Sequence, residues 1–161
     1  MQDTQTISYL LQGILIAFIP SVLVALFTAW VTVKFSMQQF FEQRWWEKKA
    51  ETYSQIVEAL SYLQYHNVEW LDSQIEGKTL SGPKVEKLSE GYFQAKEEIA
   101  KASAMGAYII SEDATVALKK LVKNFERYSQ DMVADLERDF DLIEICIKEV
   151  KSCAKRDLGL K

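Results

Sequence analysis

The feature that most constrains this chain is a run of 30 residues without a charge, from Thr4 to Val33. Between Ile7 and Val33, 20 of 27 residues are apolar. As a helix this stretch is about 40 Å long, enough to cross a hydrocarbon core of roughly 30 Å. A cleaved signal peptide begins with a basic region, whereas the only charge before the apolar run is Asp3. The sequence therefore predicts a retained N-terminal transmembrane helix, within a first domain of residues 1–36.

Charges beside the span predict its orientation. Lysine and arginine collect on the cytoplasmic side of membrane helices, and here they follow the span and none precedes it (Lys34, Arg44, Lys48, Lys49). We expect a single pass through the inner membrane, with the N-terminus outside and residues 37–161 in the cytoplasm. Aromatic side chains after the span are expected at headgroup level as an interfacial belt: Phe35, Phe40, Phe41, Trp45 and Trp46.

Small and weakly polar residues recur within the span every three or four positions. They form one drifting stripe of Gly13, Ala17, Ser21, Ala25, Thr28 and Thr32. Such stripes allow close helix approach, so they favour packing of the span against copies of itself. A narrow pore is a second interpretation of the same stripe, and small residues common to any membrane helix are a third. Pro20 is expected to kink the span because it removes a backbone hydrogen bond.

Residues 37–161 form the predicted second domain, an all-α, antiparallel helical bundle with a long C-terminal helix. Apolar residues recur at helical spacing throughout, and Gly77 with Ser81-Gly82-Pro83 marks the one strong loop. We expect one helix to reach Ile75, a second over 84–105, and a third that begins at the N-cap Ser111. The third either breaks near Asp131 or projects as a coiled coil, and it ends near Gly159.

Residues with catalytic or metal-binding chemistry are sparse. His66 is the only histidine, which excludes a histidine pair, and Gly77-Lys78-Thr79 lacks the preceding glycine of a phosphate-binding loop. Cys146 and Cys153 are interpreted as core or helix-seam residues. An acidic series at four-residue steps, Asp131, Asp135 and Asp139, is typical of a solvated face, with a carboxylate metal site as the weaker alternative. We expect no enzyme activity, no catalytic residue, no cofactor and no bound metal.

Two groups of residues are candidates for ligand binding. A basic stripe suits phosphate groups and consists of Lys119, Lys120, Lys123 and Arg127. An aromatic group at four-residue spacing suits base stacking and consists of Tyr62, His66 and Trp70, with Tyr65 beside them. The alternatives are a solvated helix face for the first group and core packing for the second.

The segment FEQRWWEKKAETYSQIVEALSYL, residues 41–63, and the arrangement of the whole chain resemble small membrane effectors accessory to type III CRISPR systems. The resemblance implies an N-terminal membrane segment and a helical cytosolic domain that binds cyclic tetra-adenylate as an oligomer. It implies no individual binding residue, because the family has no short signature to match here.

Two functions follow as hypotheses. In the first, the chain is an antiviral effector: a homo-oligomer, dimer or tetramer, binds a cyclic oligonucleotide and then perturbs the lipid bilayer, with no role for DNA. A symmetric oligomer would present the same residues to each repeat of a cyclic ligand. In the second, the chain is a constitutive structural or adaptor protein that recruits a protein partner through its cytosolic helices.

Overall fold

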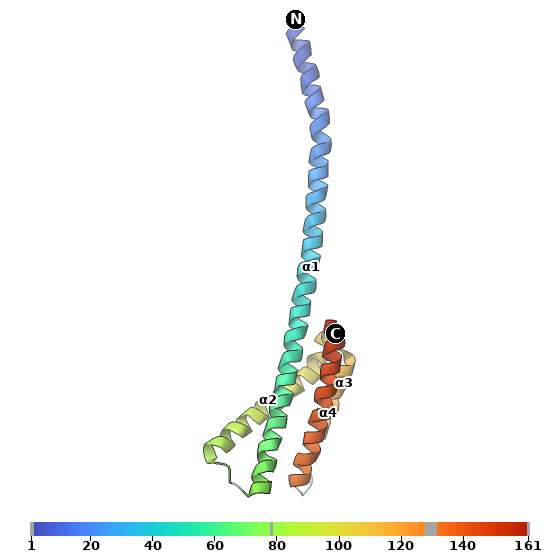
Figure 1. Ribbon diagram of the computed structural model, residues 1–161. Coiled ribbons are helices and arrows are strands. Elements are labelled where there is room, and N and C mark those ends of the chain that lie inside the picture. Colours follow the sequence, from blue (N-terminus) through green and yellow to red (C-terminus); the bar gives the residue numbers. More distant parts are fainter. Residues whose placement is uncertain (1, 78, 128–131, 161) are drawn as a thin grey trace. The chain divides into compact units, whose positions relative to one another are not determined.

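The computed structural model describes residues 2–77, 79–127 and 132–160, and within these ranges it contains helices and no strand (Figure 1). The helices are α1 (Gln2–Glu76), α2 (Gly82–Ile109), α3 (Glu112–Asn124) and α4 (Met132–Leu158). The chain divides into two compact units, Met1–Trp45 and Trp46–Lys161. We describe each unit by itself.

The first unit consists of the N-terminal part of α1, and Pro20 lies inside the helix. From Pro20 onward its large apolar side chains are exposed, among them Leu23 at 62% and Phe27 at 66%. Cations lie over two of its aromatic rings: Lys34 over Trp30 at 5.2 Å and Arg44 over Phe40 at 5.3 Å. Among the described residues, the part of α1 from Pro20 onward is the one helix long and apolar enough to cross a membrane.

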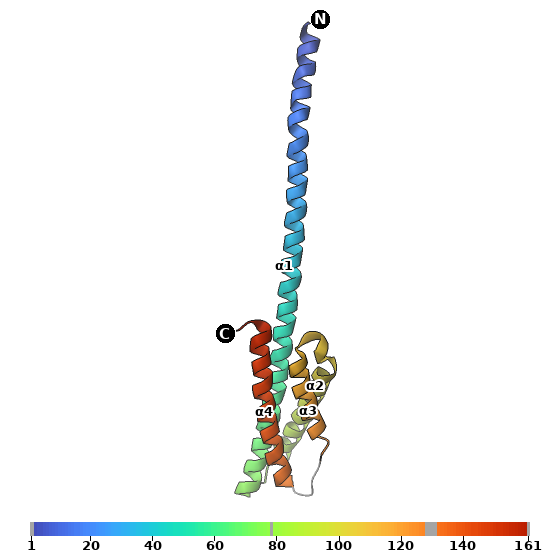
Figure 2. The ribbon, with the colours of Figure 1, turned by 90° about the vertical axis from the view of Figure 1, so that its right-hand side faces the viewer.

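The second unit packs all four helices around one apolar core, and its successive helices reverse direction (Figures 1 and 2). In α1, Tyr53, Ile56, Leu60 and Leu63 recur every three or four residues and so share one buried face. In both views α4 runs beside this part of α1, while α3 contacts both α2 and α4. The most buried large side chains are Leu60, Leu63, Ile99, Leu118, Ile143 and Val150.

Helix boundaries follow local chemistry at the predicted places. Gly77 adopts a positive φ of 62° just after α1, a conformation that costs glycine little. Ser81 is the N-cap of α2 with Pro83 in its first turn, and Ser111 is the N-cap of α3. The expected starts of one helix after the loop that begins at Gly77 and of another after Ser111 are therefore confirmed. The second helix is longer than predicted, since α2 continues to Ile109.

The predicted third helix is two helices. α3 ends at Asn124 and α4 begins at Met132, so the expectation of a break, rather than of one projecting coiled coil, is the one that holds. Asp131 itself lies outside the described residues. The resulting α4 is a helix of 27 residues, and its buried positions (Ile143, Ile147, Val150) continue the core.

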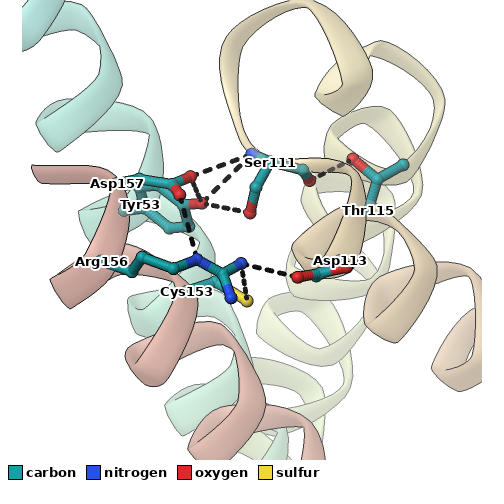
Figure 3. Close-up of polar contacts among 7 residues, drawn as sticks. All are labelled: Tyr53, Ser111, Asp113, Thr115, Cys153, Arg156 and Asp157. Atoms are coloured by element: carbon teal, nitrogen blue, oxygen red, sulfur yellow. Dashed lines mark hydrogen bonds and ion pairs between the residues drawn. The ribbon is translucent and has the colours of Figure 1, made fainter.

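A polar cluster joins three helices at one end of the second unit (Figure 3). The Tyr53 hydroxyl in α1 donates to the Asp157 carboxylate near the end of α4. The backbone N–H of Ser111 donates to the same carboxylate at 3.1 Å. Asp157 therefore caps the start of α3, in place of the Ser111 side chain, which makes no cap bond. Beside it, Arg156 pairs with Asp113 at 2.7 Å.

The pKa values of this cluster follow from burial and from these bonds. Burial, followed by the bond to Asp157, raises the pKa of Tyr53 to about 12. For Asp157, burial favours the neutral acid, but the hydrogen bonds from Tyr53 and Ser111 outweigh it and lower the pKa of the carboxyl. The charged form is thus the one that holds the helices together.

Candidate functional site

The predicted basic stripe lies on the solvent-exposed face of α3. Lys119, Lys120 and Lys123 are exposed, as is Arg127 just beyond the helix. None of the four side chains forms an ion pair with another described residue. In a chain of net charge −4, this exposed positive charge is suited to bind an anion with several phosphates.

The predicted aromatic group faces α2 rather than solvent. His66 is only 9% exposed, and its ring stacks on Tyr92 of α2 at 4.3 Å between centroids. Trp70 lies at 6.2 Å from the same ring. The buried ring, with one face already covered by Tyr92, favours core packing as the interpretation of His66, and base stacking by this residue stays a prediction.

Burial and one neighbour determine the protonation of His66. Its Nδ1 lies 3.2 Å from the Asn67 side-chain oxygen. Burial lowers the pKa of His66 and outweighs the opposing effect of this bond. Asn67 is also buried, and its amide nitrogen has no hydrogen-bond partner among the described residues. This polar pair inside the core is neutral at pH 7 and incompletely satisfied.

The structure places a cation, Lys96, beside the aromatic group, and the sequence did not indicate this cation. The ammonium of Lys96 lies over the rings of Tyr92 and Phe125, at 5.2 and 4.9 Å from their centroids. Phe125 directly follows α3, two residues before Arg127. Lys96 thus joins α2 to the end of α3 through cation–π contacts, which stabilise partly buried cations.

A groove of about 650 Å³ runs between α1 and α2, and sequence reasoning missed it. Small residues form much of its floor, including Ala59 of α1 and Ala95 of α2. The sequence feature that could have indicated the groove is the series of small residues along α2, because small side chains leave space beside a neighbouring helix. The groove is lined by Lys48, Thr52, Gln55, Ile56, Glu58, Ala59, Tyr62, Gly91, Gln94, Ala95, Glu98, Lys101, Ala102, Met105, Gly106 and Ile109.

Tyr62 is positioned in this groove by a glycine. A Cβ at Gly91 would lie 2.2 Å from the Tyr62 hydroxyl oxygen, so only glycine leaves room for the ring. The hydroxyl donates to the Lys87 carbonyl at 3.3 Å. Of the three aromatic candidates, Tyr62 is therefore the one that lines the large groove.

The predicted ligand-binding residues do not form one site. Trp70 lines a second, smaller cavity of about 320 Å³ with residues of the α1–α2 loop, Gly77 and Thr79 among them. The basic stripe of α3 lines neither cavity. A single chain thus presents a groove with polar rims and, separately, a positively charged helix face.

The stripe of small residues in the span is described only in part. Ser21, Ala25, Thr28 and Thr32 lie in α1 and are exposed within the first unit. The side-chain surroundings of Gly13 and Ala17 lie outside the described residues.

The described members of the acidic series form ion pairs with an arginine. Asp135 and Asp139 pair with Arg138 at 2.7 and 3.0 Å, and Asp131 lies outside the described residues. Burial raises the pKa of Asp139, against the lowering effect of Arg138. In the described part of the chain, no group of three metal-binding side chains comes together. Cys146 and Cys153 are buried free thiols, and burial raises the pKa of Cys146 to about 12.

Comparisons with protein-family models, with curated proteins and with solved structures found no match for this chain.

Proposed function

We propose that this protein is a single-span membrane protein whose helical 46–161 unit binds a ligand at the cytoplasmic face of the inner membrane. The observation that carries the proposal is the uncharged, apolar start of α1, where six large side chains are each more than half exposed in the first unit: Leu23, Val24, Leu26, Phe27, Trp30 and Val33. Such a surface is unfavourable in water, and its length matches a bilayer. The lysines and arginine that follow it support the cytoplasmic orientation.

The ligand that we propose is cyclic tetra-adenylate, and the response that we propose is membrane perturbation by an antiviral effector. The family resemblance suggests this ligand, and the exposed cations of the basic stripe support it. In a homo-oligomer each subunit would contribute one such face, so four phosphates would meet a ring of positive charge. Binding would change the membrane span only if two arrangements of the oligomer differ in affinity for the ligand. We propose no bond chemistry.

The test is a calorimetric titration of the full chain in lipid nanodiscs with cyclic tetra-adenylate, and with the linear tetranucleotide as control. We expect saturable binding of the cyclic form, at less than one ligand per chain, and none of the linear form. The variant Lys119→Gln/Lys123→Gln/Arg127→Gln should lose it. The matched variant Lys87→Gln/Lys151→Gln/Lys155→Gln, which removes three exposed lysines elsewhere, should retain it. No binding by a folded, membrane-inserted wild type would refute the ligand.

A second function, membrane adaptor, is favoured by the groove between α1 and α2. Its apolar floor and mixed-charge rim (Lys48, Glu58, Glu98, Lys101) suit one face of a partner helix. The substitution Ala102→Phe fills the groove, whereas Ala104→Phe makes the same change on an exposed position of the same helix. Loss of a co-purifying partner in the first variant alone, with nucleotide binding absent throughout, would support the adaptor.

A further inference from the structure

We propose that the groove between α1 and α2 binds a basic amphipathic helix of a partner protein. Apolar side chains of that helix enter the groove, and its lysines or arginines pair with Glu58 of α1 and Glu98 of α2 at the opening. The proposal rests on the adaptor function proposed above and names the chemistry of the partner. All residues that line the groove belong to the 46–161 unit.

The floor of the groove is apolar and consists mainly of small side chains. Ile56, Ala59 and Ala95 line it and are at most 4% exposed, and Ala102 is half-buried beside them. Small side chains let a third helix approach the two that form the groove, at interaxial distances of about 8–10 Å. Met105 also lines the groove and is 64% exposed, and the flexible methionine side chain adapts to the shape of a partner.

A helix suits this groove better than an extended peptide does. The groove lies between two α-helices, whose backbone groups bond within each helix. An extended chain would find few partners there for its own N–H and C=O groups, whereas a helix satisfies those groups itself. The lining residues of α1 extend from Lys48 to Tyr62, a length of about 21 Å, which matches about 14 residues of a partner helix.

The two lysines that line the groove each have a carboxylate partner on their own helix. Lys48 pairs with Glu51 at 3.4 Å, and Lys101 pairs with Glu97 at 2.7 Å. All four side chains are more than half exposed, so these pairs contribute little to stability. They do, however, place a negative charge beside each ammonium group, and the lysines therefore give the opening of the groove no net positive charge.

The two glutamates that line the groove leave its opening negatively charged. Glu58 and Glu98 are exposed, and neither forms an ion pair with another described residue. Glu98 accepts a hydrogen bond from Gln94 at 3.3 Å, and it raises the pKa of Lys101 less than Glu97 does. This surplus of carboxylates attracts a cationic partner and repels phosphate groups. The groove and the basic stripe of α3 therefore select different partners.

The test uses the full chain in phosphatidylcholine nanodiscs and two dye-labelled helical peptides of about 18 residues, slightly longer than the groove. The first peptide carries leucine and alanine on one face and lysines on both sides of that face, and the second has glutamate in place of each lysine. Fluorescence anisotropy measures binding, and empty discs give the binding to lipid, which is subtracted. Glu58→Gln/Glu98→Gln is compared with Glu137→Gln/Asp141→Asn, the same charge change at exposed positions of α4.

We expect saturable binding of the basic peptide and about tenfold weaker binding of the acidic one. Glu58→Gln/Glu98→Gln should weaken the binding of the basic peptide about fivefold, since two exposed ion pairs are lost. The matched α4 variant should retain the wild-type affinity. Ala102→Phe should abolish binding because it fills the groove, and Ala104→Phe, at an exposed position of the same helix, should not. Circular dichroism confirms that each variant is folded.

Equal binding of the two peptides, or an equal loss of affinity in the two glutamate variants, would overturn this proposal. If Ala102→Phe still loses both peptides in that case, the groove binds helices without regard to charge, and the adaptor function stands. No binding of either peptide to folded wild type would overturn the proposal as well, and co-purification then tests the adaptor by itself. The titration with cyclic tetra-adenylate is a separate measurement, because the basic stripe of α3 lines neither cavity.

Discussion

Asn67 is the buried residue with the least complete set of hydrogen bonds in the described part of the chain. It is 2% exposed and its amide nitrogen has no partner there. Leaving a buried donor unsatisfied costs about 1–3 kcal/mol. In Asn67→Leu, of similar size, loss of the unsatisfied amide nitrogen stabilises the fold and loss of the bond to His66 Nδ1 opposes it, so we expect the free energy of unfolding to change by less than about 1 kcal/mol. Asn67→Asp should lower it, because a carboxylate would be buried there. Urea denaturation measures both, and a loss of about 2 kcal/mol or more in Asn67→Leu would mean that the amide nitrogen is bonded as well.

His66 makes the free energy of unfolding depend on pH in the range between its pKa values in the unfolded and the folded chain. Burial lowers its pKa in the folded chain below the usual value of about 6.5. The unfolded chain therefore binds the proton first. The contribution of His66 to the free energy of unfolding is fully present above about pH 6.5. It falls as the pH drops from there toward the pKa that His66 has in the folded chain.

His66→Phe, which keeps an aromatic ring against Tyr92, should remove this slope. Because the chain has no other histidine, the difference between the two proteins isolates His66. Urea denaturation at several values between about pH 5.5 and 7 measures it. Parallel curves for wild type and variant would contradict the burial of the imidazole.

At the scale of helix pairs, α1 and α2 meet through Tyr62 and Gly91. A methyl group at Gly91 displaces the Tyr62 ring and breaks its bond to Lys87. An alanine in a helix is otherwise about 1 kcal/mol better than glycine. We therefore expect Gly91→Ala to destabilise the wild type by about 1 kcal/mol but to stabilise Tyr62→Ala by a similar amount. Denaturation of the four proteins measures the coupling, and the same effect in both backgrounds would refute the contact.

Three helices depend on Asp157, which accepts hydrogen bonds from Tyr53 and from the backbone of Ser111. Bonds to a charged group contribute about 1.5–3 kcal/mol. Asp157→Asn should therefore lower the free energy of unfolding by about 2 kcal/mol, and Tyr53→Phe by somewhat less. Asp141→Asn, at an exposed position of α4, is the control in the same denaturant series. An effect no larger than this control would show that another group caps α3.

At the scale of the whole molecule, the periodicity of apolar residues predicted the features that are determined within a single helix. It indicated an all-helical chain, the loop after Gly77 and the start of α3 after Ser111. It did not indicate the cap by Asp157, because that residue lies 46 positions from Ser111. Nor did it indicate the groove, or decide between base stacking and core packing for His66. Both depend on which residue of α2 faces α1, and spacing along one helix does not contain that information.

The apolar core of the 46–161 unit is built from residues of that unit, and the last prediction follows from this. Every residue of the buried core cluster lies at Tyr53 or later, so none of the described side chains of the apolar span belongs to that core. We expect residues 46–161 alone to unfold cooperatively on heating, with a midpoint within a few degrees of the full chain in nanodiscs of phosphatidylcholine. Circular dichroism and light scattering measure this. A molten 46–161 chain, or one that folds only when membrane is added, would show that the bilayer completes the core.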